Sequence, residues 1–337
     1  MQYSSIESIF EAFERLRVLV IGDVMIDSYI WGRVERISPE APVPIVQVQK
    51  REKRLGGAAN VATNLQSLGA KPILCSVIGE DTDAEDFFQI LAEQNLPSEG
   101  VLKSPHRITT VKHRIIAGTQ HLLRVDSEIT KPITLQEEQN LIAQIKKLAL
   151  GCQVIIFEDY DKGTITPTLI REVIDFANQH NIPTVVDPKK DNFLHYKKAT
   201  LFKPNLKELK EGLKIDIDAK NPDELYQAVA QLRQLLELKY ALLTLSERGV
   251  YIDDGQTQFA RPAHLRNIAD VSGAGDTVVS VAALCVALQL STPFIAALSN
   301  LAGGLVCEFA GVVPVDKQSL LSEAKKNRFF EMYMQSK

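Results

Sequence analysis

The sequence lacks the patterns that mark several common classes of protein. It has no apolar run of about 18 residues, so a transmembrane helix is not expected. Its net charge of −4 gives no electrostatic reason to expect nucleic acid or an anionic membrane as a partner. The first residues carry three glutamates and lack the basic and apolar segments of a signal peptide. They are more typical of an amphipathic helix, with Ser4 and Glu7 spaced as a capping box.

Metal, redox and common nucleotide motifs are missing as well. The four cysteines form no Cys-x-x-Cys pair, and the six histidines have no spacing typical of a zinc site. We therefore expect buried free thiols and a reducing, cytoplasmic location. No Gly-x-x-x-x-Gly-Lys-Ser/Thr sequence occurs, which excludes a P-loop nucleotide binder. No Gly-x-Gly-x-x-Gly follows the first predicted strand, so the usual dinucleotide-binding fold is unsupported.

What the sequence does contain is an alternation of short apolar runs with helical patterns. With 337 residues, 45% of them hydrophobic, the chain can bury a large core. Near-continuous apolar runs are typical of strands buried on both faces of a parallel sheet. They lie at 17–23, 70–79, 153–159, 182–188, 199–205 and 240–246, with helical patterns at 136–149, 166–180 and 222–237. We predict an α/β protein with a three-layer α/β/α sandwich and a mostly parallel central sheet.

The ends of these strands indicate where a site should lie. In open parallel sheets, ligands bind beyond the carboxyl ends of the strands. Several of the predicted strands end in an acid or an amide, namely Asp23, Asp159, Asp187 and Asn205. No internal repeat or long linker is present, so we expect a single domain over residues 1–337.

Two segments do not fit the alternation. Residues 29–50 contain three prolines and then alternate as Pro-Ile-Val-Gln-Val-Gln, and residues 108–125 also have the pattern of extended chain. Together they predict a small inserted β-sheet. Since the edges of a small sheet need cover, we expect it to act as a lid over the site or as a dimer contact. A homodimer through this lid is the oligomeric state that we expect.

The stretch 270–276, Asp-Val-Ser-Gly-Ala-Gly-Asp, precedes an apolar helix expected at 277–290. Small residues there leave backbone N–H groups open to an anion, and the helix dipole adds partial positive charge. Asp276 could accept the proton of a hydroxyl that attacks a phosphoryl group, or it could only cap a core helix. This stretch alone favours neither interpretation. The residues that would form the anion hole are Gly273, Ala274 and Gly275.

Polar groups suited to a sugar occur in two upstream stretches. Asp27 is expected just beyond the first strand, where its carboxylate could hold a pair of hydroxyls or serve as a helix cap or turn acid. Gly56 and Gly57 would allow close approach of a ligand, and Asn60 offers both a donor and an acceptor. Tight packing of a helix on the sheet is the alternative for this second stretch.

Two further stretches suit a nucleotide and its metal ion. Asn205 and Glu208 could hold a hydrated Mg²⁺ through water, or they could form an ordinary capping box. Ser246 and Gly249 follow another buried strand and could line a nucleotide pocket or form a simple turn. No direct metal ligand is predicted.

Taken together, these stretches resemble the ribokinase-type (PfkB) family of carbohydrate kinases over nearly the whole chain. The likeness rests on four motifs in order: the N-terminal acid pair, Gly-Gly-Ala-Ala-Asn, Pro-Asn-Leu-Lys-Glu and the C-terminal Gly-Ala-Gly-Asp. The last departs from the family signature at Val271 and Ser272 but keeps both glycines and the final acid.

The resemblance implies a role for each matching residue. Asp276 corresponds to the catalytic base, and Gly273, Ala274 and Gly275 correspond to the anion hole. The implied sugar-binding residues are Asp27, Gly57 and Asn60. Asn205 and Glu208 match a motif that supports magnesium and phosphate binding, and Ser246, Gly249 and Asn300 lie in regions that surround ATP. The implied cofactors are ATP and Mg²⁺, and a monovalent cation stays open.

Within the family, residues 22–46 resemble kinases of lipopolysaccharide-heptose synthesis, which phosphorylate D-glycero-β-D-manno-heptose 7-phosphate at its anomeric hydroxyl. Residues 158–163 and 185–190 resemble the same subgroup. Because that substrate carries a phosphate, cations should face the sugar, although each could also be a solvated surface charge. The cations concerned are Arg33, Arg36, Arg124, Lys162 and Lys189.

Three expectations about activity follow. Bifunctional members of the subgroup carry a second, cytidylyltransferase-like domain with a His-x-Gly-His motif, which this sequence lacks, so we expect the kinase activity alone. One alternative is a kinase of the same family that acts on ribose, fructose or another sugar phosphate. The other is a catalytically silent sugar-binding protein on the same fold.

Overall fold

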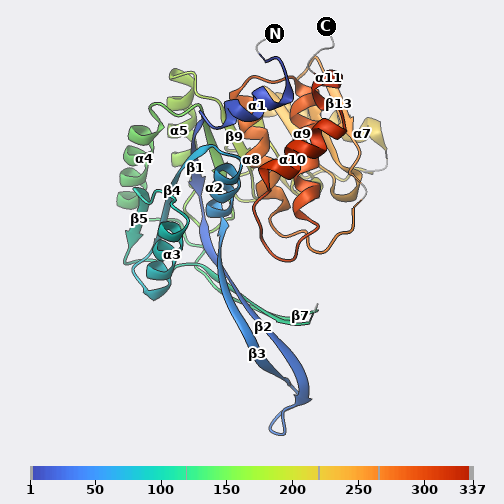
Figure 1. Ribbon diagram of the computed structural model, residues 1–337. Coiled ribbons are helices and arrows are strands. Elements are labelled where there is room, and N and C mark those ends of the chain that lie inside the picture. The colour runs from blue at the N-terminus through green and yellow to red at the C-terminus, as the bar shows by residue number, and fades with distance from the viewer. Residues whose placement is uncertain (1–2, 119, 219–220, 265, 334–337) are drawn as a thin grey trace.

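The computed structural model describes residues 3–118, 120–218, 221–264 and 266–333. Its body is a large sheet that lies between two layers of helices (Figure 1). Over the described residues this sheet has nine strands in the order β13-β12-β11-β10-β9-β8-β1-β4-β5. The strands are β1 (Arg17–Gly22), β4 (Lys71–Gly79), β5 (Gly100–Ser104), β8 (Val154–Glu158), β9 (Thr184–Asp187), β10 (Leu201–Phe202), β11 (Tyr240–Thr244), β12 (Val250–Asp253) and β13 (Gln258–Arg261).

The strands from β11 to β5 pair in parallel, and only β12 and β13 join antiparallel. Alternate side chains of a strand point to opposite faces, so an apolar run can serve two cores at once. In β1, Val18 and Val20 belong to one buried cluster, whereas Leu19 and Ile21 belong to the other. The near-continuous apolar runs of the sequence are therefore explained by cover on both faces.

Two sets of helices provide that cover. One face carries α1 (Ile6–Phe13), α2 (Ala58–Ser67), α3 (Thr82–Glu93), α8 (Ala274–Ala287), α9 (Thr292–Val306), α10 (Lys317–Lys326) and α11 (Phe329–Tyr333). The other carries α4 (Leu135–Ala149), α5 (Pro167–Gln179), α6 (Leu206–Leu213) and α7 (Pro222–Leu235). The predicted three-layer α/β/α sandwich is confirmed. None of the helices in the described ranges is long and apolar enough to cross a membrane.

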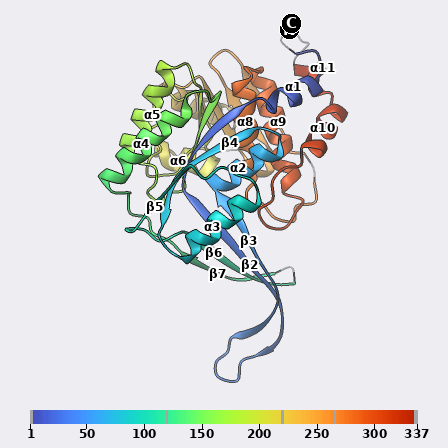
Figure 2. The same ribbon diagram turned by 60° about the vertical axis from the view of Figure 1, so that its left-hand side comes forward.

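A second, smaller sheet has the strand order β3-β2-β6-β7. Its strands are β2 (Val24–Ile37), β3 (Pro44–Gly57), β6 (Val111–Ala117) and β7 (Gln120–Ser127). The hairpin of β2 and β3 projects far from the body, which is clear from both directions of view (Figures 1 and 2). We call these four strands the lid sheet. The predicted segment 29–50 lies in its first hairpin, which is longer and includes residues 24–57. Of the predicted segment 108–125, residues 111–117 and 120–125 lie in β6 and β7, and residue 119 is outside the described residues.

Some local predictions need correction. The N-cap of α1 is Ser5, whose hydroxyl accepts from the Ser8 N–H at 3.3 Å, and not Ser4. The α8 helix begins at Ala274, three residues before the predicted start, because Gly273 adopts a left-handed φ of 78° that ends the preceding turn. Asp27 lies within lid strand β2 and not just beyond β1, since β2 begins at Val24.

The cysteine prediction is confirmed by the structure. All four thiols are free and buried, at Cys75, Cys152, Cys285 and Cys307. Burial in apolar surroundings raises the pKa of the Cys75 and Cys285 thiols, so these side chains behave as small hydrophobic groups.

Candidate active site

Asp276 lies at the centre of the candidate site, in the first turn of α8, and its side chain is buried. Its Oδ2 accepts a hydrogen bond from Nδ2 of Asn60 in α2 at 2.7 Å. Its Oδ1 accepts one from the phenol of Tyr160 at 2.8 Å. Burial raises the pKa of Asp276, and the two hydrogen bonds oppose that rise because they favour the charged carboxylate.

The backbone at the start of α8 is open toward an anion. The N–H groups of Gly273 and Gly275 have no hydrogen-bond acceptor among the described residues, whereas the Ala274 N–H donates to the Val271 carbonyl at 3.3 Å. A Cβ atom at position 273 would lie 3.0 Å from Nδ2 of Asn60, so glycine leaves room for the amide that contacts Asp276. Two of the three predicted anion-hole residues thus present free donors at a helix N-terminus.

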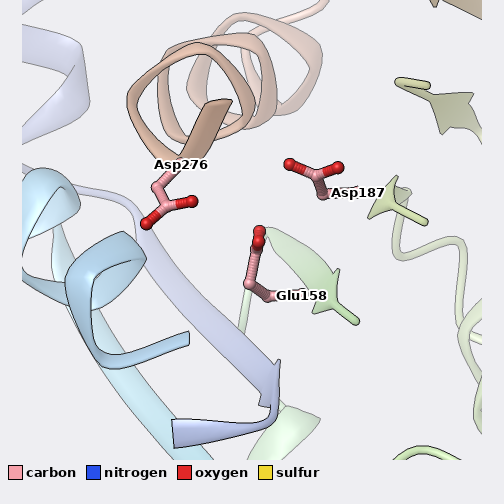
Figure 3. A group of neighbouring side chains, drawn as sticks. All are labelled: Glu158, Asp187 and Asp276. Carbon is pink, nitrogen blue, oxygen red and sulfur yellow. The ribbon is translucent and has the colours of Figure 1, made fainter. Parts of the chain in front are cut away.

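Two further carboxylates point toward Asp276 (Figure 3). They belong to Glu158, the last residue of β8, and Asp187, the last residue of β9, which are direct partners in the parallel register. One oxygen from each of the three side chains lies within 4.8 Å of the others. We call Glu158, Asp187 and Asp276 the acid cluster.

The negative charge of the acid cluster is only partly compensated within the described residues. Both carboxylate oxygens of Glu158 and the Oδ1 atom of Asp187 are buried without a hydrogen-bond partner in the described structure. Burial, followed by the charges of Asp187 and Asp276, raises the pKa of Glu158 well above its ordinary value. Asp187 has two cationic neighbours: its Oδ2 lies 2.9 Å from the Lys203 ammonium, and its Oδ1 lies 3.8 Å from the Lys189 ammonium. Oxygen atoms of this kind are the ligands that Mg²⁺ prefers, so the acid cluster fits a divalent cation.

Asp23 organises the loop that carries Tyr160. Its Oδ2 accepts from the N–H groups of Tyr160 and Lys162, both at 3.0 Å, and its Oδ1 accepts from the Thr164 N–H, also at 3.0 Å. A buried carboxylate that accepts three backbone donors holds the loop in one conformation. The first acid of the N-terminal pair therefore positions Tyr160.

The second acid of that pair, Asp27, is buried in the lid sheet and forms an ion pair with Arg114 of β6. A Cβ at Gly56 would collide with the Asp27 carboxylate, and one at Gly57, where φ is 59°, would collide with the Asp23 carbonyl. The glycine pair is thus explained by close packing against the acid pair. Whether these residues also bind a sugar stays a prediction.

The predicted cations are divided between different parts of the structure. Lys189 lies next to the acid cluster, 2.9 Å from Glu208 and 3.8 Å from Asp187. Lys162 pairs with Glu128 at 2.8 Å. Arg124 pairs with Asp126 on β7 and its side chain is 60% exposed. Arg33 and Arg36 are exposed on the projecting hairpin.

The residues that the sequence predicted to surround ATP and Mg²⁺ contribute to caps, turns and hydrogen bonds within the fold. Asn205 and Glu208 form the capping box of α6, with distances of 2.9 and 2.8 Å, so the ordinary helix-start interpretation holds for both. Ser246 is exposed at the start of a short 3₁₀ helix, and Gly249 has φ 91° in the following turn. Asn300 in α9 is buried and donates to the Pro262 carbonyl at 2.8 Å.

Sequence reasoning missed several residues of this site. Glu158 ends an apolar strand, and that position was the signal that could have identified it. Tyr160 and Arg114 had no such signal, since a tyrosine in a loop and an arginine in a strand are common. Their importance depends on contacts made across the fold.

Comparisons with known proteins agree with this architecture. The family model described as "pfkB family carbohydrate kinase" matches residues 15–318. The chain is 37% identical over 325 residues to the "Bifunctional protein HldE" of Geotalea uraniireducens, covering 96% of this chain and 66% of that protein. This chain therefore spans just under two thirds of the length of that curated relative.

Solved structures share the fold at low sequence identity. Phosphofructokinase-2 from Escherichia coli in complex with substrates and products aligns with a TM-score of 0.75 at 18% identity, covering 92% of this chain and 99% of that one. Arabidopsis thaliana ribokinase complexed with ribose and ATP aligns with a TM-score of 0.70 at 15% identity, covering 91% and 98%. At these identities the likeness shows the fold alone.

Proposed function

Because this chain belongs to the pfkB family of carbohydrate kinases, we propose that it transfers the γ-phosphoryl group of ATP to the anomeric hydroxyl of D-glycero-β-D-manno-heptose 7-phosphate. The product would be heptose 1,7-bisphosphate, a precursor for the lipopolysaccharide core. The observation that carries the kinase reaction is the buried Asp276 at the start of α8. The heptose is supported by the likeness to relatives named bifunctional protein HldE and by the resemblance of residues 22–46 to heptose kinases.

In this proposal Asp276 accepts the proton of the sugar hydroxyl as that oxygen attacks the phosphoryl group. Asn60 and Tyr160 hold its carboxylate in place and leave each oxygen with a further lone pair. The N–H groups of Gly273 and Gly275 stabilise negative charge on the transferred group. No covalent intermediate is needed, since positioning and electrostatics supply the catalysis.

The residues that would hold Mg²⁺ are Glu158 and Asp187, because both oxygens of Glu158 and Oδ1 of Asp187 are buried without a hydrogen-bond partner in the described structure. Bound there, the ion would supply positive charge to the phosphate groups of the nucleotide. Glu208 and Asn205 contribute indirectly, since Glu208 anchors Lys189 beside Asp187 and Asn205 caps the same helix. Ser246, Gly249 and Asn300 remain our proposal for the surroundings of ATP.

The lid sheet is the proposed dimer contact. Its strands expose apolar side chains that a solvated sheet does not need: Val34, Ile37, Val48, Leu123 and Val125. The two outer strands, β3 and β7, also present open edges. A second copy of the chain would cover both features. The reduced cysteines support the cytoplasm as the place of action.

The proposed function is tested by measuring ADP release with heptose 7-phosphate, ribose and fructose 6-phosphate at matched concentrations. We expect the highest kcat/KM with heptose 7-phosphate, and a new anomeric phosphate in the ³¹P NMR spectrum of the product. A higher kcat/KM with either other sugar would assign the kinase to that sugar. Sugar binding without any ADP release would support the silent sugar-binding alternative.

A further inference from the structure

Lys112 is a half-buried cation of the lid sheet that has no ion-pair partner among the described residues. It lies in β6, directly opposite Asp27 of β2 in the parallel register. Its ammonium is 5.6 Å from the centre of the Tyr160 ring. Among the described residues, no carboxylate lies within ion-pair distance of the Lys112 ammonium and no acceptor is hydrogen-bonded to it.

The neighbouring cations differ from Lys112 in this respect. Arg114, two residues along the same strand, is paired with Asp27. Lys162 is paired with Glu128, and Lys189, which also lies near the Tyr160 ring at 5.1 Å, is paired with Glu208. Each of these charges is balanced within the protein. Lys112 has no such direct partner in the described structure, and the carboxylates of Asp27, Glu128 and Asp126 attract it only from beyond ion-pair distance.

An ammonium group that has lost part of its water and gained no counter-ion is unfavourable. Burial accordingly lowers the pKa of Lys112, with the Asp27 charge acting in the opposite sense. A bound anion would remove this cost and form a charge-assisted hydrogen bond with the ammonium. The contact with the Tyr160 ring offsets only a part of this desolvation cost, since cation–π contacts at partly exposed sites are weak.

The position of Lys112 indicates which anion this is. The ring that it faces belongs to the tyrosine whose hydroxyl binds Asp276, so Lys112 and the proposed base are neighbours of the same side chain. A sugar whose reacting hydroxyl is at Asp276 and that extends along Tyr160 would reach the lid sheet. A phosphate at the far end of that sugar would meet Lys112.

We propose that Lys112 binds the phosphate group of the sugar substrate and thereby selects a phosphorylated sugar over its neutral counterpart. This inference rests on the proposed kinase function and adds to it the residue that recognises the substrate's charge. Lys112 is absent from the cations that the sequence predicted for this purpose. Arg124, which was among them, is exposed and paired on β7.

The test is Lys112→Met, which keeps an unbranched apolar side chain and removes the charge. We expect the KM for heptose 7-phosphate to rise roughly 10- to 100-fold, the range for a lost hydrogen bond to a charged group. The KM values for ATP and for the neutral heptose should stay at the wild-type level. Lys112→Arg, which restores the charge, should recover most of the affinity for the phosphorylated sugar.

Lys103→Met is the matched control. Its ammonium also lies over an aromatic ring, 5.1 Å from the centre of Phe88, but on β5 at the edge of the large sheet. We expect this variant to match the wild type with every substrate. An equal rise in the KM for phosphorylated and neutral heptose in Lys112→Met would assign Lys112 a structural role only, and no rise for either would also overturn the proposal.

Failure of the proposed sugar can be separated from failure of this inference by measuring binding without ATP. Calorimetric titration of the wild type with heptose 7-phosphate, fructose 6-phosphate and their neutral forms shows which phosphorylated sugar binds. If heptose 7-phosphate does not bind but fructose 6-phosphate does, the proposed substrate is wrong, and Lys112→Met should weaken the fructose 6-phosphate complex. If no phosphorylated sugar binds more tightly than its neutral form, the proposal for Lys112 is wrong.

Discussion

Tyr160 donates a hydrogen bond of 2.8 Å to Oδ1 of Asp276, and so holds one oxygen of the proposed base. Burial, and then the neighbouring acids, raise the pKa of Tyr160 well above that of a free phenol. The phenol therefore stays protonated and remains a donor across the range in which a kinase works. With Asn60 on Oδ2, this contact keeps the carboxylate oriented and favours its charged form.

Asp276→Asn should lower kcat by roughly 10²- to 10⁴-fold, because the variant lacks the base but keeps the shape of the side chain. The KM values for sugar and ATP should stay near those of the wild type. Asp86→Asn, at an acid on α3 that pairs with Lys53, is the control and should be fully active. Retention of more than about a tenth of wild-type turnover, which lies outside the range for a general base, would remove Asp276 from this function.

Tyr160→Phe should move the acidic limb of the pH–kcat profile to higher pH. A base works when deprotonated, so activity falls as the pH drops through the pKa of Asp276. Burial has already raised that pKa, and the Tyr160 hydrogen bond lowers it. Loss of the hydrogen bond therefore raises the pKa of Asp276 further, and the enzyme loses activity at a higher pH as the solution is acidified.

Tyr196→Phe is the control for this experiment. It also removes a phenol from a buried carboxylate, that of Asp159 at 2.7 Å, but not from the base. Its acidic limb should coincide with that of the wild type. An unchanged limb in Tyr160→Phe would show that the phenol does not tune Asp276.

Gly273→Ala should reduce both stability and kcat. Alanine at φ 78° is strained by about 1–2 kcal/mol. Its Cβ would lie 3.0 Å from Nδ2 of Asn60, so the amide that binds Asp276 would have to shift. Gly118→Ala separates the two effects, since Gly118 has φ 61° but open space around it. Urea denaturation should show a lower free energy of unfolding for both variants, and only Gly273→Ala should have a lower kcat. Equal kcat values for the two would argue against the packing of Asn60 on Gly273.

Substituting charged residues for two exposed apolar side chains on one face of β7 should dissociate the proposed dimer. Leu123 and Val125 are 56% and 46% exposed and, two residues apart, lie on the same face of the strand. The double variant Leu123→Glu, Val125→Glu should elute as a monomer in size-exclusion chromatography with light scattering. Leu235→Glu changes a leucine of similar exposure, 45%, on α7 and should leave the mass unchanged. A monomeric wild-type protein would contradict the dimer.

Much of the fold could be predicted because its signals are local. Strands such as β1 and β8 are apolar throughout, since both faces of each strand are covered, and this is visible in any short window of sequence. The glycines and acid at 273–276 likewise form a contiguous pattern. The family assignment that these motifs suggested is confirmed by the match over residues 15–318.

The sequence by itself thus determined the layers, the family and the proposed base. The tertiary structure alone decided which groups surround that base. Asn60 and Asp276 are 216 residues apart, and Glu158 meets Asp187 only because β8 and β9 are neighbours in matching register. Whether a charge is paired, as in Arg114, or unpaired, as in Lys112, depends in the same way on side chains brought together from distant strands. Strand order and register are long-range properties, and no local window of sequence contains them.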